Sequence, residues 1–227
     1  VFEAIKASAY HNDRDVEIIT IEAEKLEEND SHVWDLLKSV DGIVMPGGFG
    51  KRGVEGKILA TTWARENKIP YLGLCLGMHV LLIEVARSLL NLKDASSTEF
   101  DKDVKNPVVC LVDEQKGITT KGGTMRLGAY PCSILPATIA RKAYNKNEVM
   151  ERHRHRYEFN SEYKKQFEEV GVVFSGVYKK ENLVEISELK DHPFMLGCQF
   201  HPEFLSTPLR PHPLFKAFME AVLNLQD

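Results

Sequence analysis

The sequence IPYLGLCLGM, residues 69–78, decides the fold. It joins a short apolar run to a helical pattern over residues 78–90, and at the junction Cys75 stands between Gly73 and Gly77. A reactive side chain flanked in this way is typical of a nucleophile elbow, here with Cys in place of Ser, because the strained turn and the close strand–helix contact both favour glycine. Cys75 is then predicted at the positive end of the helix, where the thiolate is favoured. The alternative is a buried structural cysteine in a core strand.

Length and composition indicate a single α/β domain with no nucleic-acid or membrane partner. The chain has 227 residues, of which 43% are hydrophobic and 27% charged, and its formal net charge of −4 cannot neutralise a row of phosphates. No apolar stretch has the length of a membrane span, and the start of the chain has no signal peptide. The four cysteines form no CxxC pair. We therefore expect reduced thiols and a cytoplasmic protein, without disulfides or zinc.

Hydrophobic periodicity predicts alternating strands and helices around this elbow. The expected strands cover residues 16–21, 41–45, 69–72, 107–112, 128–135, 149–159, 172–177, 183–189 and 194–200, and the expected helices cover 1–10, 33–40, 54–67, 78–90, 161–170 and 213–225. Residues 94–100 and 113–128 are expected as loops. This order predicts an α/β fold with an open, mainly parallel sheet, helices on both faces and a flavodoxin-like core. Because such a domain usually has a strand before its first helix, we also expect a strand upstream of Val1.

The glycine cluster Pro46-Gly47-Gly48-Phe49-Gly50 follows the strand expected at 41–45. Taken alone, such a cluster is an ordinary tight turn. In an open parallel sheet, however, ligands bind outside the carboxyl ends of the strands, so this loop should lie beside the elbow. Its N–H groups are then suited to hold an oxyanion.

The run Arg152-His153-Arg154-His155-Arg156-Tyr157 suggests either a metal site or an anion site. Side chains alternate along an extended chain, so the three arginines share one face and the two histidines share the other. Two histidines without a third nearby ligand are poor evidence for zinc. We favour an arginine that binds a substrate carboxylate through two hydrogen bonds.

His201 and Glu203 directly follow the last expected strand and share one face of the extended chain. This is the arrangement that a base and its orienting carboxylate require. Together with Cys75 they suggest a Cys–His–Glu site for acyl transfer, in which Cys75 attacks an amide or ester carbonyl. The N–H groups of Leu76 and Gly48 would bind the oxyanion.

The sequence resembles the triad-type, or class I, glutamine amidotransferases, and within them the C-terminal glutaminase domains of the CTP synthase family. The segments that carry the resemblance are PGGFGKRGVEGK (46–57), PYLGLCLGM (70–78), SSTEF (96–100), GGTMRLG (122–128), ERHRHRYEFN (151–160) and CQFHPEF (198–204). The elbow and the His-Pro-Glu triplet are shared by the whole class, whereas the other segments are close to diagnostic of CTP synthases.

The resemblance implies a domain that hydrolyses L-glutamine to glutamate and ammonia, with no cofactor or metal of its own. It assigns the catalytic triad to Cys75, His201 and Glu203, and agrees with an oxyanion hole at Gly48 and Leu76. The glutamine-binding positions that it implies are Gly48, Phe49, Leu76, Gly77, Met78, His79, Glu99, Arg156 and Tyr157. Glu99 would meet the α-ammonium of the substrate and Arg156 its α-carboxylate.

The resemblance also implies partners that these 227 residues do not contain. Ammonia would pass to an N-terminal synthetase domain of the same polypeptide, which converts UTP to CTP with ATP and Mg²⁺. The full-length enzyme is expected to be a homo-oligomer, a tetramer. GTP is the expected activator, acting through the loop around residues 113–120. This chain alone is therefore not expected to make CTP.

One residue departs from the family pattern, because His79 stands where the family usually has Gln. We expect a contact with glutamine from its backbone rather than from its side chain. Two other functions stay open. A γ-glutamyl peptidase would use the same triad, although the loops shared with CTP synthases argue against it. A binding module would keep the fold mainly for assembly or regulation.

Overall fold

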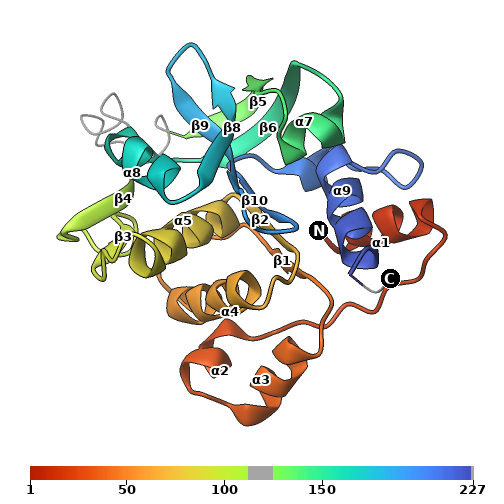
Figure 1. Cartoon of the computed structure of the whole chain (residues 1–227), viewed down its shortest axis with the longest axis horizontal. Coiled ribbons are helices and arrows are strands. Elements are labelled where there is room, and N and C mark those ends of the chain that lie inside the picture. The colour runs from red at the N-terminus through yellow and green to blue at the C-terminus, as the bar shows by residue number, and fades with distance from the viewer. Residues whose placement is uncertain (112–124, 226–227) are drawn as a thin grey trace.

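The computed structural model describes residues 1–111 and 125–225 (Figure 1). The helices are α1 (Phe2–His11), α2 (Ala23–Glu27), α3 (Ser31–Lys38), α4 (Val54–Glu66), α5 (Leu76–Ser88), α7 (Ile139–Tyr144), α8 (Lys164–Glu169) and α9 (Pro213–Leu223), with single 3₁₀ turns at Ser161–Tyr163 and Pro202–Phe204. The strands are β1 (Ile43–Met45), β2 (Tyr71–Leu74), β3 (Ala95–Ser97), β4 (Asn106–Leu111), β5 (Arg126–Ile134), β6 (Glu148–His155), β7 (Tyr157–Phe159), β8 (Val172–Tyr178), β9 (Leu183–Leu189) and β10 (Met195–Cys198). Of the loop expected at 113–128, residues 113–124 lie outside the described residues.

Seven strands form the main sheet in the order β1-β2-β10-β9-β8-β5-β6, and β3, β4 and β7 form a smaller one. β1, β2 and β10 run parallel. The remaining neighbours in the main sheet pair antiparallel. The α/β class is confirmed, but the sheet is mixed rather than mainly parallel, because β5, β6, β8 and β9 pair antiparallel with their neighbours. β8 and β9 form a hairpin with a short turn at residues 179–182, and β5 folds back onto β6 after α7. The unit β1-α4-β2 keeps the parallel arrangement and leads into the elbow.

Helices cover both faces of the parallel part of the sheet (Figure 1). Tyr71 of β2 belongs to an apolar cluster that includes residues of α2, α3, α4 and α5. Its neighbours Leu72 and Leu74 belong to a second cluster that includes residues of α1, α7 and α9. Because side chains alternate across a strand, β2 is held by apolar packing on both sides. This packing fixes the strand that leads into Cys75.

Several elements differ from the sequence-based expectation. The helices α2 and α7 were not predicted. α7 is short, and its N-cap residue is Thr138, whose hydroxyl accepts a hydrogen bond from the N–H of Arg141 at 3.1 Å. Residues 94–100, expected as a loop, contain β3. Residues 126–128 were also expected as a loop, but they belong to β5 because they pair with residues 153–155 of β6.

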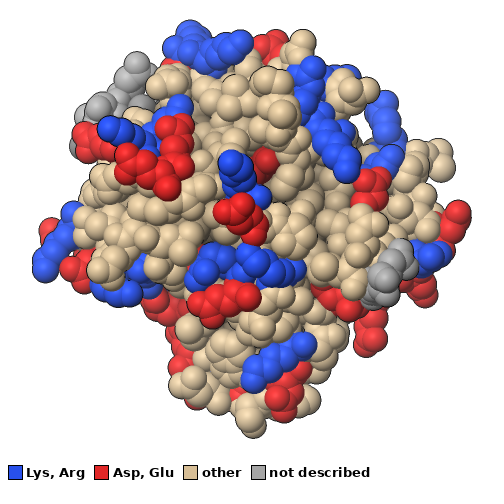
Figure 2. Space-filling view, viewed as in Figure 1, with Lys and Arg blue, Asp and Glu red and all other residues tan. Residues whose placement is uncertain are grey.

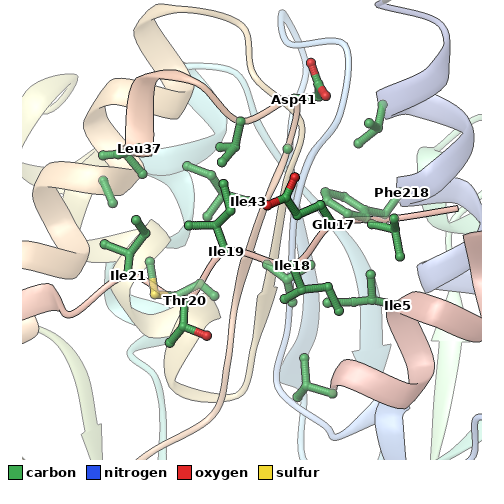
Figure 3. Close-up of a pocket in the computed structure, with 18 of the residues that line it drawn as sticks. Ile5, Glu17, Ile18, Ile19, Thr20, Ile21, Leu37, Asp41, Ile43 and Phe218 are labelled. Atoms are coloured by element: carbon green, nitrogen blue, oxygen red, sulfur yellow. The ribbon is translucent and has the colours of Figure 1, made fainter. Parts of the chain in front are cut away.

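Residues 16–21, predicted as a strand, do not pair with any strand in the described part of the chain. Their side chains do alternate, since Val16 and Ile18 pack on the cluster of α1 and α9 and Ile21 packs on the opposite cluster. A cavity of about 500 Å³, however, lies between this segment and β1 (Figure 3). The prediction was wrong because a strand needs a partner about 4.8 Å away, and the cavity occupies that position.

The surface carries both signs of charge. Figure 2 shows basic and acidic side chains interspersed over the face in view. Within residues 1–111 and 125–225, none of the helices combines the length and the apolar character that crossing a bilayer requires.

Candidate active site

Cys75 lies at a strained turn between β2 and α5, with φ 52° and ψ −102°. A non-glycine residue with positive φ costs about 1–3 kcal/mol and persists only where its surroundings enforce it. The flanking glycines do so by close approach. A Cβ atom on Gly73 would lie 2.6 Å from the carbonyl carbon of Gly77, and one on Gly77 would lie 2.3 Å from the carbonyl oxygen of Met45. The nucleophile-elbow geometry predicted from the glycine spacing is therefore confirmed.

The Cys75 thiol is almost completely buried, with 3% of the residue exposed. Burial raises its pKa to about 12, the backbone N–H of Leu76 lowers it, and the carboxylates of Glu203, Glu99 and Glu158 raise it further. The sequence led us to expect that the start of α5 favours the thiolate. The N–H of Leu76 acts in that direction, but burial outweighs it. Ionisation of Cys75 therefore depends on other groups that accept its proton or stabilise the sulfur.

His201 and Glu203 lie just beyond the end of β10 and form a hydrogen bond of 2.8 Å between Nδ1 and Oε1. The ring of Phe204 stacks on the imidazole at 4.7 Å between centroids. The backbone N–H of His201 donates to the carbonyl of Arg152 at 2.8 Å. A carboxylate on Nδ1 favours the tautomer with the proton there, which leaves Nε2 as the basic nitrogen. Nε2 has no hydrogen-bond partner among the described residues.

The loop after β1 brings the imidazole and the thiol together. A Cβ atom on Gly47 would lie 2.8 Å from Cε1 of His201 and 3.5 Å from Cβ of Cys75, so both side chains contact the same glycine. A Cβ atom on Gly48 would lie 3.1 Å from Cδ2 of Leu76. The loop therefore lies against the elbow, as expected for segments that follow the carboxyl ends of neighbouring parallel strands. The Cys75 and His201 side chains and the backbones of two adjacent loops therefore meet at one place.

A second group of polar residues lies beside this loop. Glu99, which follows β3, accepts a hydrogen bond of 2.8 Å from the N–H of Gly50. Burial raises the pKa of Glu99, while the Gly50 N–H and the Arg156 guanidinium lower it. Burial also raises the pKa of Tyr157, and the negative charge of Glu99 adds to that shift. Glu99, Arg156 and Tyr157 are thus close enough to influence one another electrostatically, although they come from different elements.

The remaining expected glutamine-binding residues lie in two different places. Phe49 is exposed, and the guanidinium of Arg154 lies 6.0 Å from the centre of its ring. Gly77 and Met78 are buried in the first turn of α5; Gly77 packs on Met45, and Met78 lies beneath Gly197 of β10. The His79 side chain is also buried, with Nε2 2.8 Å from Oε1 of Gln199.

The alternation predicted for the Arg-His run is confirmed within β6. Arg152 and Arg154 are exposed, whereas His153 and His155 are buried. β6 ends at His155, so Arg156 lies in the bend before β7 rather than on the shared face of the strand. In the part of the chain that the structure describes, no group of three or more His, Cys, Asp and Glu residues has an arrangement suited to a metal ion.

The two histidines belong to a buried charge cluster that the sequence analysis missed. Arg126 of β5 donates to Glu158 of β7 and to Glu185 of β9, both at 2.8 Å. Nε2 of His153 lies 3.2 Å from Oε2 of Glu185, and His153 Nδ1 lies 2.8 Å from His155 Nε2. A sequence signal existed, because these charged residues occupy inward positions of otherwise apolar strands. Their partners, however, are distant in the sequence.

Comparisons with known proteins place the chain in a family. The family model described as "Glutamine amidotransferase class-I" matches residues 1–221. A protein of Caldanaerobacter subterraneus subsp. tengcongensis named CTP synthase is 55% identical, and the match covers 100% of this chain and 42% of the relative. For the CTP synthase of Geotalea uraniireducens these values are 51%, 98% and 41%. The chain therefore spans about two fifths of the length of these relatives.

Solved structures agree with the sequence matches. The structure described as "Trypanosoma brucei CTPS - glutaminase domain with bound acivicin" superimposes with a TM-score of 0.92 and 37% identity, covering 98% of this chain and 86% of that chain. A glutamine amidotransferase of Thermotoga maritima shares the fold, with a TM-score of 0.51 and 13% identity over 83% of this chain and 79% of that chain. This chain thus belongs to the class-I glutamine amidotransferase family and, within it, to the glutaminase domains of CTP synthases.

Proposed function

We propose that this domain hydrolyses the side-chain amide of L-glutamine with Cys75 as the nucleophile. The observation that carries the proposal is the contact of Cys75 and His201 with the same glycine, Gly47, at the mouth of a strained elbow. The hydrogen bond from His201 Nδ1 to Glu203 leaves Nε2 to take the thiol proton. Glutamine hydrolysis also agrees with the family to which the chain belongs.

The reaction proceeds in two steps, formation of a thioester on Cys75 and its hydrolysis by water. The Cys75 sulfur attacks the amide carbon, and the carbonyl oxygen becomes an oxyanion held by the N–H groups of Gly48 and Leu76. His201 then donates the proton to the amide nitrogen, the C–N bond breaks, and ammonia leaves. Water attacks the thioester with His201 as general base, and glutamate and the Cys75 thiol are released.

The polar group beside the loop accounts for specificity toward an α-amino acid. In this proposal Glu99 binds the α-ammonium and Arg156 the α-carboxylate, with Phe49 and Tyr157 at the edge of the site. Gly77, Met78 and His79 contribute through backbone groups at the start of α5, since the side chains of Met78 and His79 are buried in the core. The carboxylate of Glu99 is half-buried, which strengthens its attraction for a cationic group.

Covalent labelling tests the nucleophile. The chain is incubated with a thiol-directed glutamine analogue and the modified peptide is identified by mass spectrometry. We expect a single adduct on Cys75, protection by glutamine, and loss of the adduct and of ammonia release in Cys75→Ser. Cys110→Ser serves as the matched control and should label like the parent. An adduct that persists in Cys75→Ser would refute the assignment, and equal or faster turnover of γ-glutamyl peptides would favour a peptidase instead.

For the longer polypeptide we infer the activity that the relatives' name describes. Ammonia from this domain would aminate UTP to CTP in a fused N-terminal synthetase domain that uses ATP and Mg²⁺, with GTP as activator, in a cytoplasmic homotetramer. A polypeptide that contains both domains should form CTP from UTP with either glutamine or free ammonia. Cys75→Ser in that polypeptide should abolish the glutamine-dependent reaction only.

We also infer that the cavity beside β1 accepts one more strand, contributed by residues upstream of Val1. The backbone N–H and C=O groups of residues 17–21 make no hydrogen bond within the described chain, and β1 pairs on one edge only, with β2. Val1 lines the cavity, whose walls include Ile5, Ile18 and Phe218. An apolar strand there would pair with both edges and would bury alternate side chains against the two clusters.

Hydrogen exchange tests the additional strand. Amides of residues 17–21 should exchange fast in this 227-residue chain and should become protected by at least about a hundredfold, roughly 2.7 kcal/mol, in a polypeptide extended upstream of Val1. Amides of β2, which are already paired, should change little. Equal exchange of residues 17–21 in the two polypeptides would refute the additional strand.

A further inference from the structure

A buried amide–imidazole pair lies behind the sulfur of Cys75. Gln199 directly follows β10 and is fully buried, and His79 lies one turn after Cys75 on α5 with 2% of the residue exposed. His79 Nε2 is 2.8 Å from Gln199 Oε1, and Gln199 Nε2 is 3.9 Å from Cys75 Sγ. The three side chains form a continuous chain of polar contacts inside an otherwise apolar region.

The protonation of His79 fixes the orientation of the Gln199 amide. Burial lowers the pKa of His79 to about 4, so the imidazole is neutral at pH 7 and carries one N–H. Nδ1 has no hydrogen-bond partner in the described residues. An N–H without a partner costs more than a bare ring nitrogen, so the proton belongs on Nε2 and is donated to Gln199 Oε1. The NH₂ group of Gln199 therefore faces the sulfur.

Backbone hydrogen bonds fix Gln199 and Cys75 relative to each other. The N–H of Gln199 donates to the carbonyl of Glu185 at 2.8 Å, and the N–H of Cys75 donates to the carbonyl of Cys198 at 2.7 Å. Both backbones are thus tied to the same end of the sheet. Strand pairing thus fixes the two backbones from which the side chains extend, and the contact with His79 holds the amide at the end of the Gln199 side chain. A donor fixed in this way is effective for a developing charge, because it needs no reorganisation.

We propose that Gln199 is a catalytic hydrogen-bond donor that stabilises the Cys75 thiolate, and that His79 is a positioning residue that orients the Gln199 amide. The inference rests on the proposed role of Cys75 as nucleophile. It supplies the stabilisation that the buried sulfur needs, because a donor near a thiolate favours the charged form. It also gives the His79 side chain a role that does not involve contact with glutamine.

The ionisation of Cys75 itself provides the test. The alkylation rate of Cys75 by iodoacetamide is followed against pH by mass spectrometry in the parent chain, in Gln199→Met and in His79→Leu. Met keeps the approximate shape of Gln without a donor, and Leu removes the group that orients the amide. In both variants we expect the apparent pKa of Cys75 to rise by about one unit, equivalent to roughly a tenfold lower alkylation rate at neutral pH. His79→Gln, which restores a donor, should return the profile to within about twofold of the parent.

The kinetics of glutamine hydrolysis distinguish a specific effect on the Cys75 thiolate from a general disturbance of packing around the site. Loss of thiolate stabilisation should lower kcat for ammonia release while KM for glutamine changes by less than about twofold. A parent-like alkylation profile in folded Gln199→Met or His79→Leu would overturn the proposal. If Gln199→Met does not fold, the pair His79→Leu and His79→Gln decides. A parent chain that alkylates as expected but releases no ammonia would refute the proposed function and leave the thiolate assignment standing.

Discussion

The elbow at Cys75 and the buried charge cluster around Arg126 are stabilised in different ways. At the elbow, a strained Cys75 is held by glycines whose missing side chains allow backbones to touch. At the charge cluster, Arg126 is held by carboxylates from two other strands. The elbow depends on the absence of atoms, whereas the cluster depends on the presence of matched charges. The strain at Cys75 can be recognised from residues close together in the sequence. The ion pairs of Arg126 join residues far apart in the sequence, so only the folded structure shows them.

Removal of the cation should have the largest effect. Arg126→Met leaves Glu158 and Glu185 buried without their guanidinium partner, and we expect a loss of about 3–5 kcal/mol in the free energy of unfolding at pH 7. Burial raises the pKa of Glu158 and Glu185 above the usual range for a carboxyl group, and the Arg126 guanidinium opposes that rise. The loss should therefore shrink at acidic pH, where both carboxyl groups are neutral whether or not the arginine is present. Urea unfolding at pH 7 and pH 5 measures both effects. Arg154→Met, on the exposed face of β6, should change stability by less than about 0.5 kcal/mol; a similar loss in both variants would contradict the cluster's role.

The elbow could be predicted from sequence because its determinants lie within five residues. Gly73 and Gly77 flank Cys75 at fixed spacing, and the same spacing places them against each other and against β1. The His201–Glu203 pair was predictable for the same reason, since two residues of one extended segment form it. The conformation of a short segment and its amino-acid types were sufficient in both cases.

The charge cluster and the Gln199 contact could not be predicted in this way. Arg126 is 32 residues from Glu158 and 59 from Glu185, and His79 is 120 residues from Gln199, so only the fold brings them together. The failure at residues 16–21 has the same cause. Their alternation was interpreted correctly, but a strand is defined by its neighbour, and the cavity beside β1 occupies that position.

The second prediction concerns the pH dependence of stability, to which His79 beside the elbow should make a separate contribution. Burial lowers the pKa of His79 to about 4, against about 6.5 in the unfolded chain, so below pH 6.5 the unfolded state binds a proton that the folded state does not. This contribution to stability is complete above pH 6.5 and is lost as the pH falls toward 4, for a total of about 3 kcal/mol. His79→Gln should remove that part of the pH dependence. The part that remains belongs to buried groups such as His153 and His155, whose pKa values are also lowered by burial.

Unfolding free energies at several pH values between 7 and 4 measure the difference. Parent and His79→Gln should diverge in slope across this range and run parallel above pH 7. Slopes that coincide throughout would show that His79 does not stay neutral in the folded state.

Adding a methyl group at a glycine tests whether the elbow depends on close approach of backbones. In Gly77→Ala the new Cβ meets the Met45 carbonyl oxygen at 2.3 Å, a backbone atom that cannot rotate away. We expect about 1–3 kcal/mol of destabilisation and a large drop in Cys75 alkylation, because β1 and the elbow must separate. Gly171→Ala is the control: its φ is +92°, but nothing lies within 4 Å of the new Cβ. That variant should lose about 1 kcal/mol from backbone strain alone and should keep the parent alkylation rate. Equal effects on alkylation would show that the elbow does not depend on close approach.

An exposed ion pair gives the smallest effect and sets the scale for the cluster. Arg87 and Glu55 are joined by contacts of 2.6 and 3.1 Å, a geometry as favourable as that of Arg126. The side chain of Glu55, however, is 59% exposed, so water already solvates its charge in the unfolded and the folded state. A double-mutant cycle with Arg87→Ala and Glu55→Ala should therefore yield a coupling of about 0.5 kcal/mol, reduced further by salt. Comparable coupling in the exposed pair and in the Arg126 cluster would mean that geometry rather than burial sets the energy of these ion pairs.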